Sequence, residues 1–250
     1  MIEPNELAWI LAAGLATGVG GLALLAFPKP SDLLLDALLG FTAGVMLAAT
    51  AFSLLVPALD LGSLAEVLLG FALGGALLLG LDAAVPHVHA RFAERGHEDA
   101  DVRRENRGLL LISALTIHNV PEGMAVGVAF AAGGPELGVP IAIAIGLQNI
   151  PEGFAAGAPL LEGGGSRRRA AGVAAATGAV EPPAALLAVA AFGVASALLP
   201  LGLAFAAGAM LYVVIDELIP ESHARGNERI ATVALLLGFA LMLTLDNAFA

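Results

Sequence analysis

The feature that most constrains this chain is its division into long apolar blocks separated by short charged stretches. One helical crossing of a bilayer needs about 20 consecutive apolar residues. Eight blocks of that kind occupy most of the 250 residues. Because only 13% of the residues are charged, about half the share in an ordinary soluble domain, the chain is neither a soluble enzyme nor a membrane anchor with a separate catalytic head.

These blocks predict an all-α, polytopic membrane protein with one transmembrane domain over residues 1–250. Backbone polar groups cannot stay unpaired in hydrocarbon, so only helices or a closed β-barrel can cross it. The blocks are unbroken and rich in Ala and Leu, without the alternation of barrel strands. The eight predicted helices span residues 7–27, 33–57, 63–84, 108–131, 137–160, 170–191, 196–219 and 229–249.

The basic residues predict the orientation of the helices. All eleven Lys and Arg residues fall in the connections after the first, third, fifth and seventh spans. Because Lys and Arg are retained on the cytoplasmic side, we expect both termini to lie outside the cytoplasm. The first block lacks a basic segment before it, which favours a retained span over a cleaved signal. The Ala-rich, cysteine-free composition is typical of a bacterial inner-membrane protein.

Composition also limits the partners. A net charge of −11 argues against nucleic acid, and the absence of Cys removes thiolate metal sites and cysteine nucleophiles. We expect no prosthetic group. The one long connection, residues 85–107, is predicted to be cytoplasmic and contains His87 and His89, which either accept a metal transiently or belong to an ordinary polar loop.

Two predicted spans carry the same polar motif. Residues 118–123 read HNVPEG, and residues 148–153 read QNIPEG thirty positions later. Within each motif the first residue and the Glu are four apart, on one helical face. Each Pro frees a backbone carbonyl of the preceding turn, and the Gly-x-x-x-Gly pairs that follow permit close helix approach. We therefore expect the two polar faces to meet near the centre of the bilayer.

Such a meeting would place Glu122 and Glu152 together in a medium where an uncompensated charge costs several kcal/mol. Glu181 in the sixth span adds a third carboxylate. A divalent cation or protons must neutralise this cluster. The mixed nitrogen and oxygen donors, with His118 alone as imidazole, suit Zn²⁺ and other first-row metals better than Ca²⁺ or Mg²⁺. Met46 in the second span either supplies a thioether or simply packs.

At these motifs the sequence resembles the Zrt/Irt-like (ZIP) metal transporters. Glu181-Pro182 and residues 44–54 of the second span add to the likeness, and the latter pattern is closest to the bacterial GufA-like branch. The resemblance implies a ZIP-like helical bundle with two ions per protomer. By analogy, the first metal position would use Met46, His118, Glu122, Gln148 and Glu152. The second would use Asn119, Glu122, Asn149, Glu152 and Glu181.

In that analogy Glu122 and Glu152 bridge the two metal positions. Some relatives carry Asp where this chain has Asn149, a change that removes one charge from the second position. Glu217 in the seventh span stands where relatives often show a His-Glu pair, and is a lesser candidate. The resemblance further implies a homodimer, inward movement of zinc, iron, manganese, cadmium or cobalt, and an elevator-like shift of spans 1, 4, 5 and 6.

Two other functions use the same residues. A cation or proton channel could be built on the same acids. An intramembrane metalloenzyme is less well supported, because the sequence has no His-Glu-x-x-His, and a set of carboxylates and amides with one imidazole activates zinc-bound water poorly. We therefore expect a divalent-metal importer rather than an enzyme.

Overall fold

The computed structural model describes residues 3–26, 30–84, 100–162, 164–192 and 196–249, and within these ranges the chain forms helices and no strand. The apolar blocks therefore form helices, as predicted. The helices are α1 (Pro4–Ala26), α2 (Asp32–Ala48), α3 (Val56–Leu61), α4 (Leu64–Ala84), α5 (Ala100–Glu162), α6 (Arg167–Gly178), α7 (Glu181–Phe192), α8 (Leu199–Val213), α9 (Ile219–Ser222) and α10 (Glu228–Phe249).

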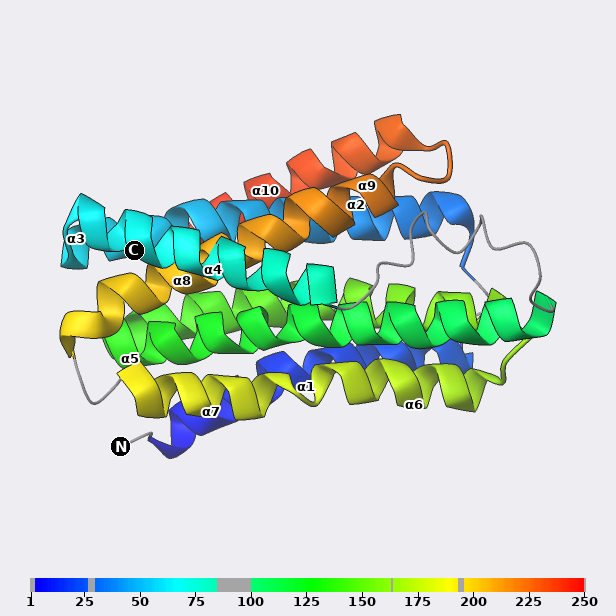
Figure 1. Cartoon of the computed structure of the whole chain (residues 1–250), viewed down its shortest axis with the longest axis horizontal. Coiled ribbons are helices and arrows are strands. Elements are labelled where there is room, and N and C mark those ends of the chain that lie inside the picture. Colours follow the sequence, from blue (N-terminus) through cyan, green and yellow to red (C-terminus); the bar gives the residue numbers. More distant parts are fainter. Residues whose placement is uncertain (1–2, 27–29, 85–99, 163, 193–195, 250) are drawn as a thin grey trace.

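The helices lie roughly parallel to one long axis and form two layers (Figure 1). The first layer contains α1, α5, α6 and α7, in which α5 packs against the other three helices and α1 also packs against α6. The second contains α2, α3, α4, α8, α9 and α10. Helix α5 also contacts α2 and α8, so it lies at the boundary between the two layers.

Helix α5 turns back on itself at Gly133 and Gly134. Gly134 has a φ of +56°, a conformation that favours glycine because it has no Cβ, and Gly133 is also non-helical. In a straight helix, residues 122 and 148 would lie about 39 Å apart. Their side chains instead form a hydrogen bond, so α5 consists of two antiparallel limbs. The predicted spans 108–131 and 137–160 correspond to these limbs.

Seven segments of the described chain are long and apolar enough to cross a membrane. One of them, the two-limbed part of α5, is 43 residues long. Each of its limbs corresponds to one of the spans predicted from the sequence. The number of crossings itself stays a prediction. The segments are Pro4–Ala26, Asp32–Leu61, Leu64–Leu81, Thr116–Ala158, Arg167–Phe192, Leu199–Ser222 and Glu228–Ala248.

Three details differ from the prediction. Residues 100–107, expected to be loop, are the first turns of α5. The sixth span is divided into α6 and α7, with α7 starting at Glu181. Pro182 and Pro183 explain the division, because proline cannot continue the hydrogen bonding of a preceding helix but fits the first turn of a new one. The third difference is that the second and seventh spans widen into π-helical stretches, η1 (Ala49–Leu55) and η3 (Val214–Leu218).

The outward faces of the bundle carry large apolar side chains. Leu187 is 71% exposed, Leu237 62% and Leu15 57%. Such side chains are costly in water and suited to lipid tails. The exposed faces therefore agree with a multi-pass membrane protein.

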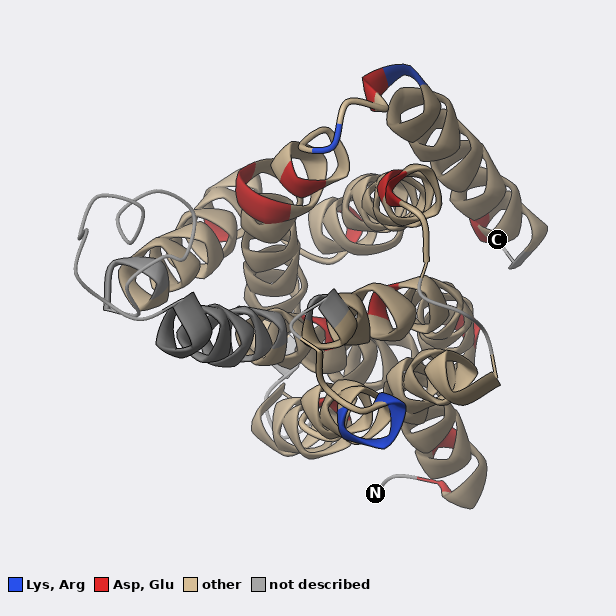
Figure 2. Cartoon of the chain, turned by 90° about the vertical axis from the view of Figure 1, so that its right-hand side faces the viewer, with Lys and Arg blue, Asp and Glu red and all other residues tan. Residues whose placement is uncertain are grey.

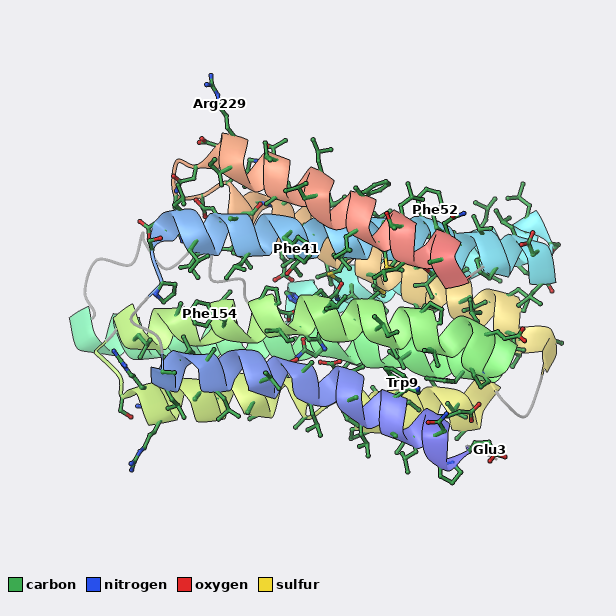
Figure 3. All side chains as sticks on the ribbon, turned by 180° about the vertical axis from the view of Figure 1, so that it is seen from behind. Glu3, Trp9, Phe41, Phe52, Phe154 and Arg229 are labelled. Atoms are coloured by element: carbon green, nitrogen blue, oxygen red, sulfur yellow. The ribbon has the colours of Figure 1, made fainter. Side chains whose placement is uncertain are left out.

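The described arginines lie at one end of the bundle. Both chain ends lie at one end in Figure 1, and the start of α6 and the connection from α9 to α10 lie at the other. The arginines at that second end are drawn blue in Figure 2, and Figure 3 shows Arg229 and Glu3 at opposite ends. The described arginines thus gather away from the termini, as the sequence predicts, and which side of the membrane they face stays a prediction.

A buried ion pair holds the arginine-bearing end of the second layer together. Asp36 of α2 is fully buried, and Arg225 Nη1 donates a 2.9 Å hydrogen bond to its Oδ1. Asn227 Nδ2 donates another of 2.9 Å to Oδ2, and Arg225 also pairs with Glu221. Burial alone would lower the pKa of Arg225, but these acidic partners raise it overall, so the guanidinium stays charged.

Candidate metal site

The two polar motifs meet between the limbs of α5. Gln148 Nε2 donates a 2.7 Å hydrogen bond to Glu122 Oε1, and both side chains are fully buried. Glu122 also lies near enough to Glu152 and Glu181 for their charges to interact. The structure therefore brings together the acids that the sequence predicts to meet.

The imidazole of His118 is paired across the two layers. Its Nε2 lies in hydrogen-bonding contact with Oε1 of Glu217, a residue of η3 in the second layer. His118 is 4% exposed and Glu217 18%. A π-helical turn changes the direction of the side chains that follow, and here it accompanies the contact between Glu217 of η3 and His118. Glu217 thus lies against the site, although its role as a ligand stays a prediction.

A separate hydrogen-bond network surrounds Glu181 at the start of α7. Asn149 Nδ2 donates to Glu181 Oε1 at 2.9 Å and to Oε2 at 2.8 Å. Thr17 of α1 donates its hydroxyl to Oε1 at 3.1 Å. The same Asn149 nitrogen lies 3.0 Å from the carbonyl of Ala13. Since three acceptor oxygens surround this atom, it must be the amide nitrogen, and the orientation of Asn149 is settled by its neighbours.

Several other buried polar atoms on α5 have no hydrogen-bond partner. Buried polar atoms are almost always paired in folded proteins, because leaving them unpaired costs free energy. Of the eight such side-chain atoms found within the described ranges, seven belong to the two motifs and one to Thr50. The seven are Asn119 Nδ2 and Oδ1, Glu122 Oε2, Gln148 Oε1, Asn149 Oδ1, and Glu152 Oε1 and Oε2.

These atoms have the chemistry of metal ligands. Two of the seven atoms belong to the amide of Asn119. The other five are carboxylate or amide oxygens that accept no hydrogen bond. Among the described residues, however, no three His, Asp or Glu side chains converge closely enough to hold an ion unaided. Holding a cation here therefore requires amide oxygens or a change in side-chain rotamers.

The glycines after each motif do permit close approach, but not between the limbs of α5 as the sequence suggested. A Cβ at Gly123 would lie 2.3 Å from the carbonyl oxygen of Glu181, so this limb packs on α7. A Cβ at Gly153 would lie 1.9 Å from the carbonyl oxygen of Thr17, so the other limb packs on α1. The expectation about their partners was wrong, because small residues reveal that a backbone approaches but not which one.

The remaining predicted residues are Met46, His87 and His89, and of these the structure describes Met46 alone. Met46 of α2 is 1% exposed and belongs to the main apolar cluster, which also contains Ala125 and Ile145 of α5. Its thioether as a metal ligand stays a prediction. His87 and His89 lie outside the described residues.

The sequence prediction does not include two buried residues that form hydrogen bonds with distant charged side chains, Thr17 with Glu181 and Asp36 with Arg225. Thr17 is a lone hydroxyl in the first apolar block, and Asp36 is a lone acid inside the second. Polar residues in the middle of apolar blocks are a usable signal, since each needs a partner there. Nothing in the sequence indicates that the partners are Glu181 and Arg225.

Together, the apolar bundle and its buried row of carboxylates, amides and imidazole define a polytopic membrane protein with a polar centre. A family model described as ZIP zinc transporter matches residues 82–246. The chain therefore belongs to the ZIP family of metal transporters.

Curated relatives cover nearly the whole chain. Zinc transporter GufA of Myxococcus xanthus is 46% identical over 245 residues, which are 94% of this chain and 95% of the relative. Zinc transporter ZIPB of Bordetella bronchiseptica is 44% identical, over 95% of this chain and 79% of the relative. Zinc transporter ZIP11 of Homo sapiens is 34% identical, over 92% and 93%. All three names describe transport, so the chain is a membrane metal transporter rather than an enzyme.

Proposed function

We propose that this protein imports divalent transition-metal ions, zinc foremost, through a site between the limbs of α5. The observation that carries the proposal is the group of buried oxygens without hydrogen-bond donors on Glu122, Gln148 and Glu152. Buried carboxylates need a counter-charge, and a divalent cation supplies it together with the missing contacts. The names of the relatives support zinc as the main cargo.

The ion is bound by His118, Glu122, Gln148 and Glu152, with Met46 approaching from α2. This mixture of imidazole nitrogen and oxygen donors favours Zn²⁺, Fe²⁺, Mn²⁺, Cd²⁺ and Co²⁺ over Ca²⁺ and Mg²⁺. His118 must leave Glu217 before its nitrogen can coordinate the ion. The second position implied by the family uses Asn119, Asn149 and Glu181, beside the first.

The two layers supply the parts for an elevator-like movement. Helices α1, α5, α6 and α7 pack closely through glycines, whereas α5 meets the second layer through side chains such as His118 and Glu217. The first layer then moves as one body and carries the ion toward the end that bears the arginines. By the positive-inside rule that end is cytoplasmic, which makes the movement import. A homodimer in a bacterial inner membrane completes the proposal.

Metal uptake into proteoliposomes tests this function. Wild-type protein should give saturable uptake of Zn²⁺ that decreases with the Glu122→Ala/Glu152→Ala double variant to the level of empty liposomes. The matched control is Glu136→Ala, which removes an exposed acid from the turn of the same helix and should keep wild-type uptake. Wild-type flux in the double variant would refute the assignment, and an ohmic current without saturation would indicate a channel.

A further inference from the structure

The two metal positions implied by the ZIP family are unequal in this chain. Atoms of Glu122, Gln148 and Glu152 have no hydrogen-bond partner, and the side-chain oxygens of Asn119 and Asn149 in the second position have none either. Glu181, the acid that belongs to the second position alone, has donors on both carboxylate oxygens. Of the three acids, Glu181 is thus the one whose two oxygens are both already hydrogen-bonded.

Resting on the proposed function, we infer that each protomer carries one divalent ion, bound at Glu122 and Glu152, and that the Thr17–Asn149–Glu181 hydrogen bonds take the place of a second ion. The amide of Asn149 donates to Glu181 at 2.8 and 2.9 Å, and the hydroxyl of Thr17 donates at 3.1 Å. Hydrogen bonds to a charged acceptor are about twice as strong as those between neutral groups. They occupy both oxygens of Glu181, which a second ion would otherwise have to contact.

Charge balance leads to the same number of ions. Glu122 and Glu152 are 0% and 3% exposed, and their two negative charges balance one divalent cation. A second cation would bring two more positive charges against the single charge of Glu181. The surplus would be buried without compensation, which is strongly unfavourable in a low-dielectric interior. Glu217 contributes less to this balance, because it lies in the second layer and its side chain is 18% exposed to solvent, which screens its charge.

Residue 149 determines this difference. An aspartate at that position could not donate to Glu181 and would add a negative charge beside it. Two acids would then face each other, and a second cation would be needed to neutralise them. Asn149 removes that charge and replaces the cation by an N–H donor, so the amide is a specificity determinant for the number of ions.

The test counts ions in the purified full-length protein and in the Asn149→Asp variant. We expect one Zn²⁺ per protomer in wild type by calorimetry and elemental analysis, and two in Asn149→Asp. Crystals soaked in Cd²⁺ should show one anomalous peak between the limbs of α5 in wild type, and a second beside Glu181 in the variant. Asn247→Asp, the same change at an exposed position, is the matched control and should keep one ion.

The outcomes separate this inference from the proposed function. Two ions in wild type, or one ion in a folded Asn149→Asp variant, would overturn the inference while leaving metal transport intact. No ion between the limbs of α5 in wild type, together with no uptake, would overturn the proposed function instead. If Asn149→Asp does not fold, as judged by its elution and melting profile, the wild-type count and anomalous map still decide the question.

Discussion

Gln148 and Glu122 stand 26 positions apart in the sequence, and the amide of the first donates a 2.7 Å hydrogen bond to the carboxylate of the second. This contact joins the two limbs of α5 at the polar motifs. It leaves Gln148 Oε1 and Glu122 Oε2 without partners, in the position where the proposed ion binds. The pair thus orients one free oxygen on each limb.

Replacing Gln148 by Ala should weaken zinc binding. The variant loses an amide oxygen and leaves Glu122 without its donor. A hydrogen bond to a charged group contributes about 1.5–3 kcal/mol, so we expect the Kd for Zn²⁺ to increase about tenfold to a hundredfold. Titration against a competing chelator measures this. Leu147→Ala, at an outward position that is 40% exposed, is the control, and an unchanged Kd in Gln148→Ala would contradict the prediction.

Glu217→Gln should strengthen zinc binding. Glu217 pairs with the imidazole of His118, and the ion must displace it. If the substitution makes this contact about 1 kcal/mol weaker, the ion displaces Glu217 more easily and the affinity for Zn²⁺ increases about fivefold. The Kd is again the measurement. In a His118→Ala background the same substitution should have no effect, and an equal gain there would show that Glu217 does not act through His118.

Gly153→Ala should destabilise the first layer. The added Cβ would lie 1.9 Å from the carbonyl oxygen of Thr17, which is backbone and cannot rotate away. Overpacking of this kind costs about 1–3 kcal/mol or more, so the melting temperature in detergent should drop clearly. Gly172→Ala is the control, because nothing lies within 4 Å of its Cβ. Alanine is the better helix former there, so a stability equal to or above wild type is expected.

Arg225→Met should destabilise the second layer by about 3 kcal/mol, because it leaves the fully buried Asp36 without a counter-charge. Adding Asp36→Asn removes that buried charge and should recover much of the loss. Thermal unfolding of both variants gives the comparison. If the double variant is no more stable than Arg225→Met alone, the buried charge is not the cause.

The raised pKa of Arg225 adds a pH expectation to this pair. A group whose pKa is higher in the folded than in the unfolded protein contributes its full stabilisation at any pH below the pKa it has in the unfolded chain. That stabilisation is lost only when the pH rises through the pKa of the group in the folded protein. Because the pKa of Arg225 is raised above its already high ordinary value, the contribution of Arg225 to stability should be unchanged throughout the neutral and moderately alkaline range.

Much of this architecture could be predicted from local pattern. Apolar length gives the helices, and the repeat of HNVPEG as QNIPEG indicates that Glu122 and Glu152 belong to one site. Pairings between distant helices could not be predicted in the same way. The partners of Thr17 and of Gly153 depend on which helices are neighbours, and that is decided by the packing of the whole bundle.

The division of the sixth span shows the same limit. The prolines after Glu181 mark a disruption, but a proline in a membrane helix is compatible with either a kink or a new start. In the structure the chain starts a new helix, and its first residue is Glu181 itself. The break places that carboxylate within reach of Thr17 and Asn149, which no local rule would specify.

The glycine contacts of the first layer have a mechanical consequence. Where main chain rests directly on main chain, as at Gly20 against Ile150 and Gly127 against Ala185, no rotamer is available to absorb sliding. The four helices of this layer are then stiff relative to one another. The proposed movement of the ion would then take place along the boundary between the two layers. There, His118 and Glu217 meet through side chains that can rotate, and not through main chain.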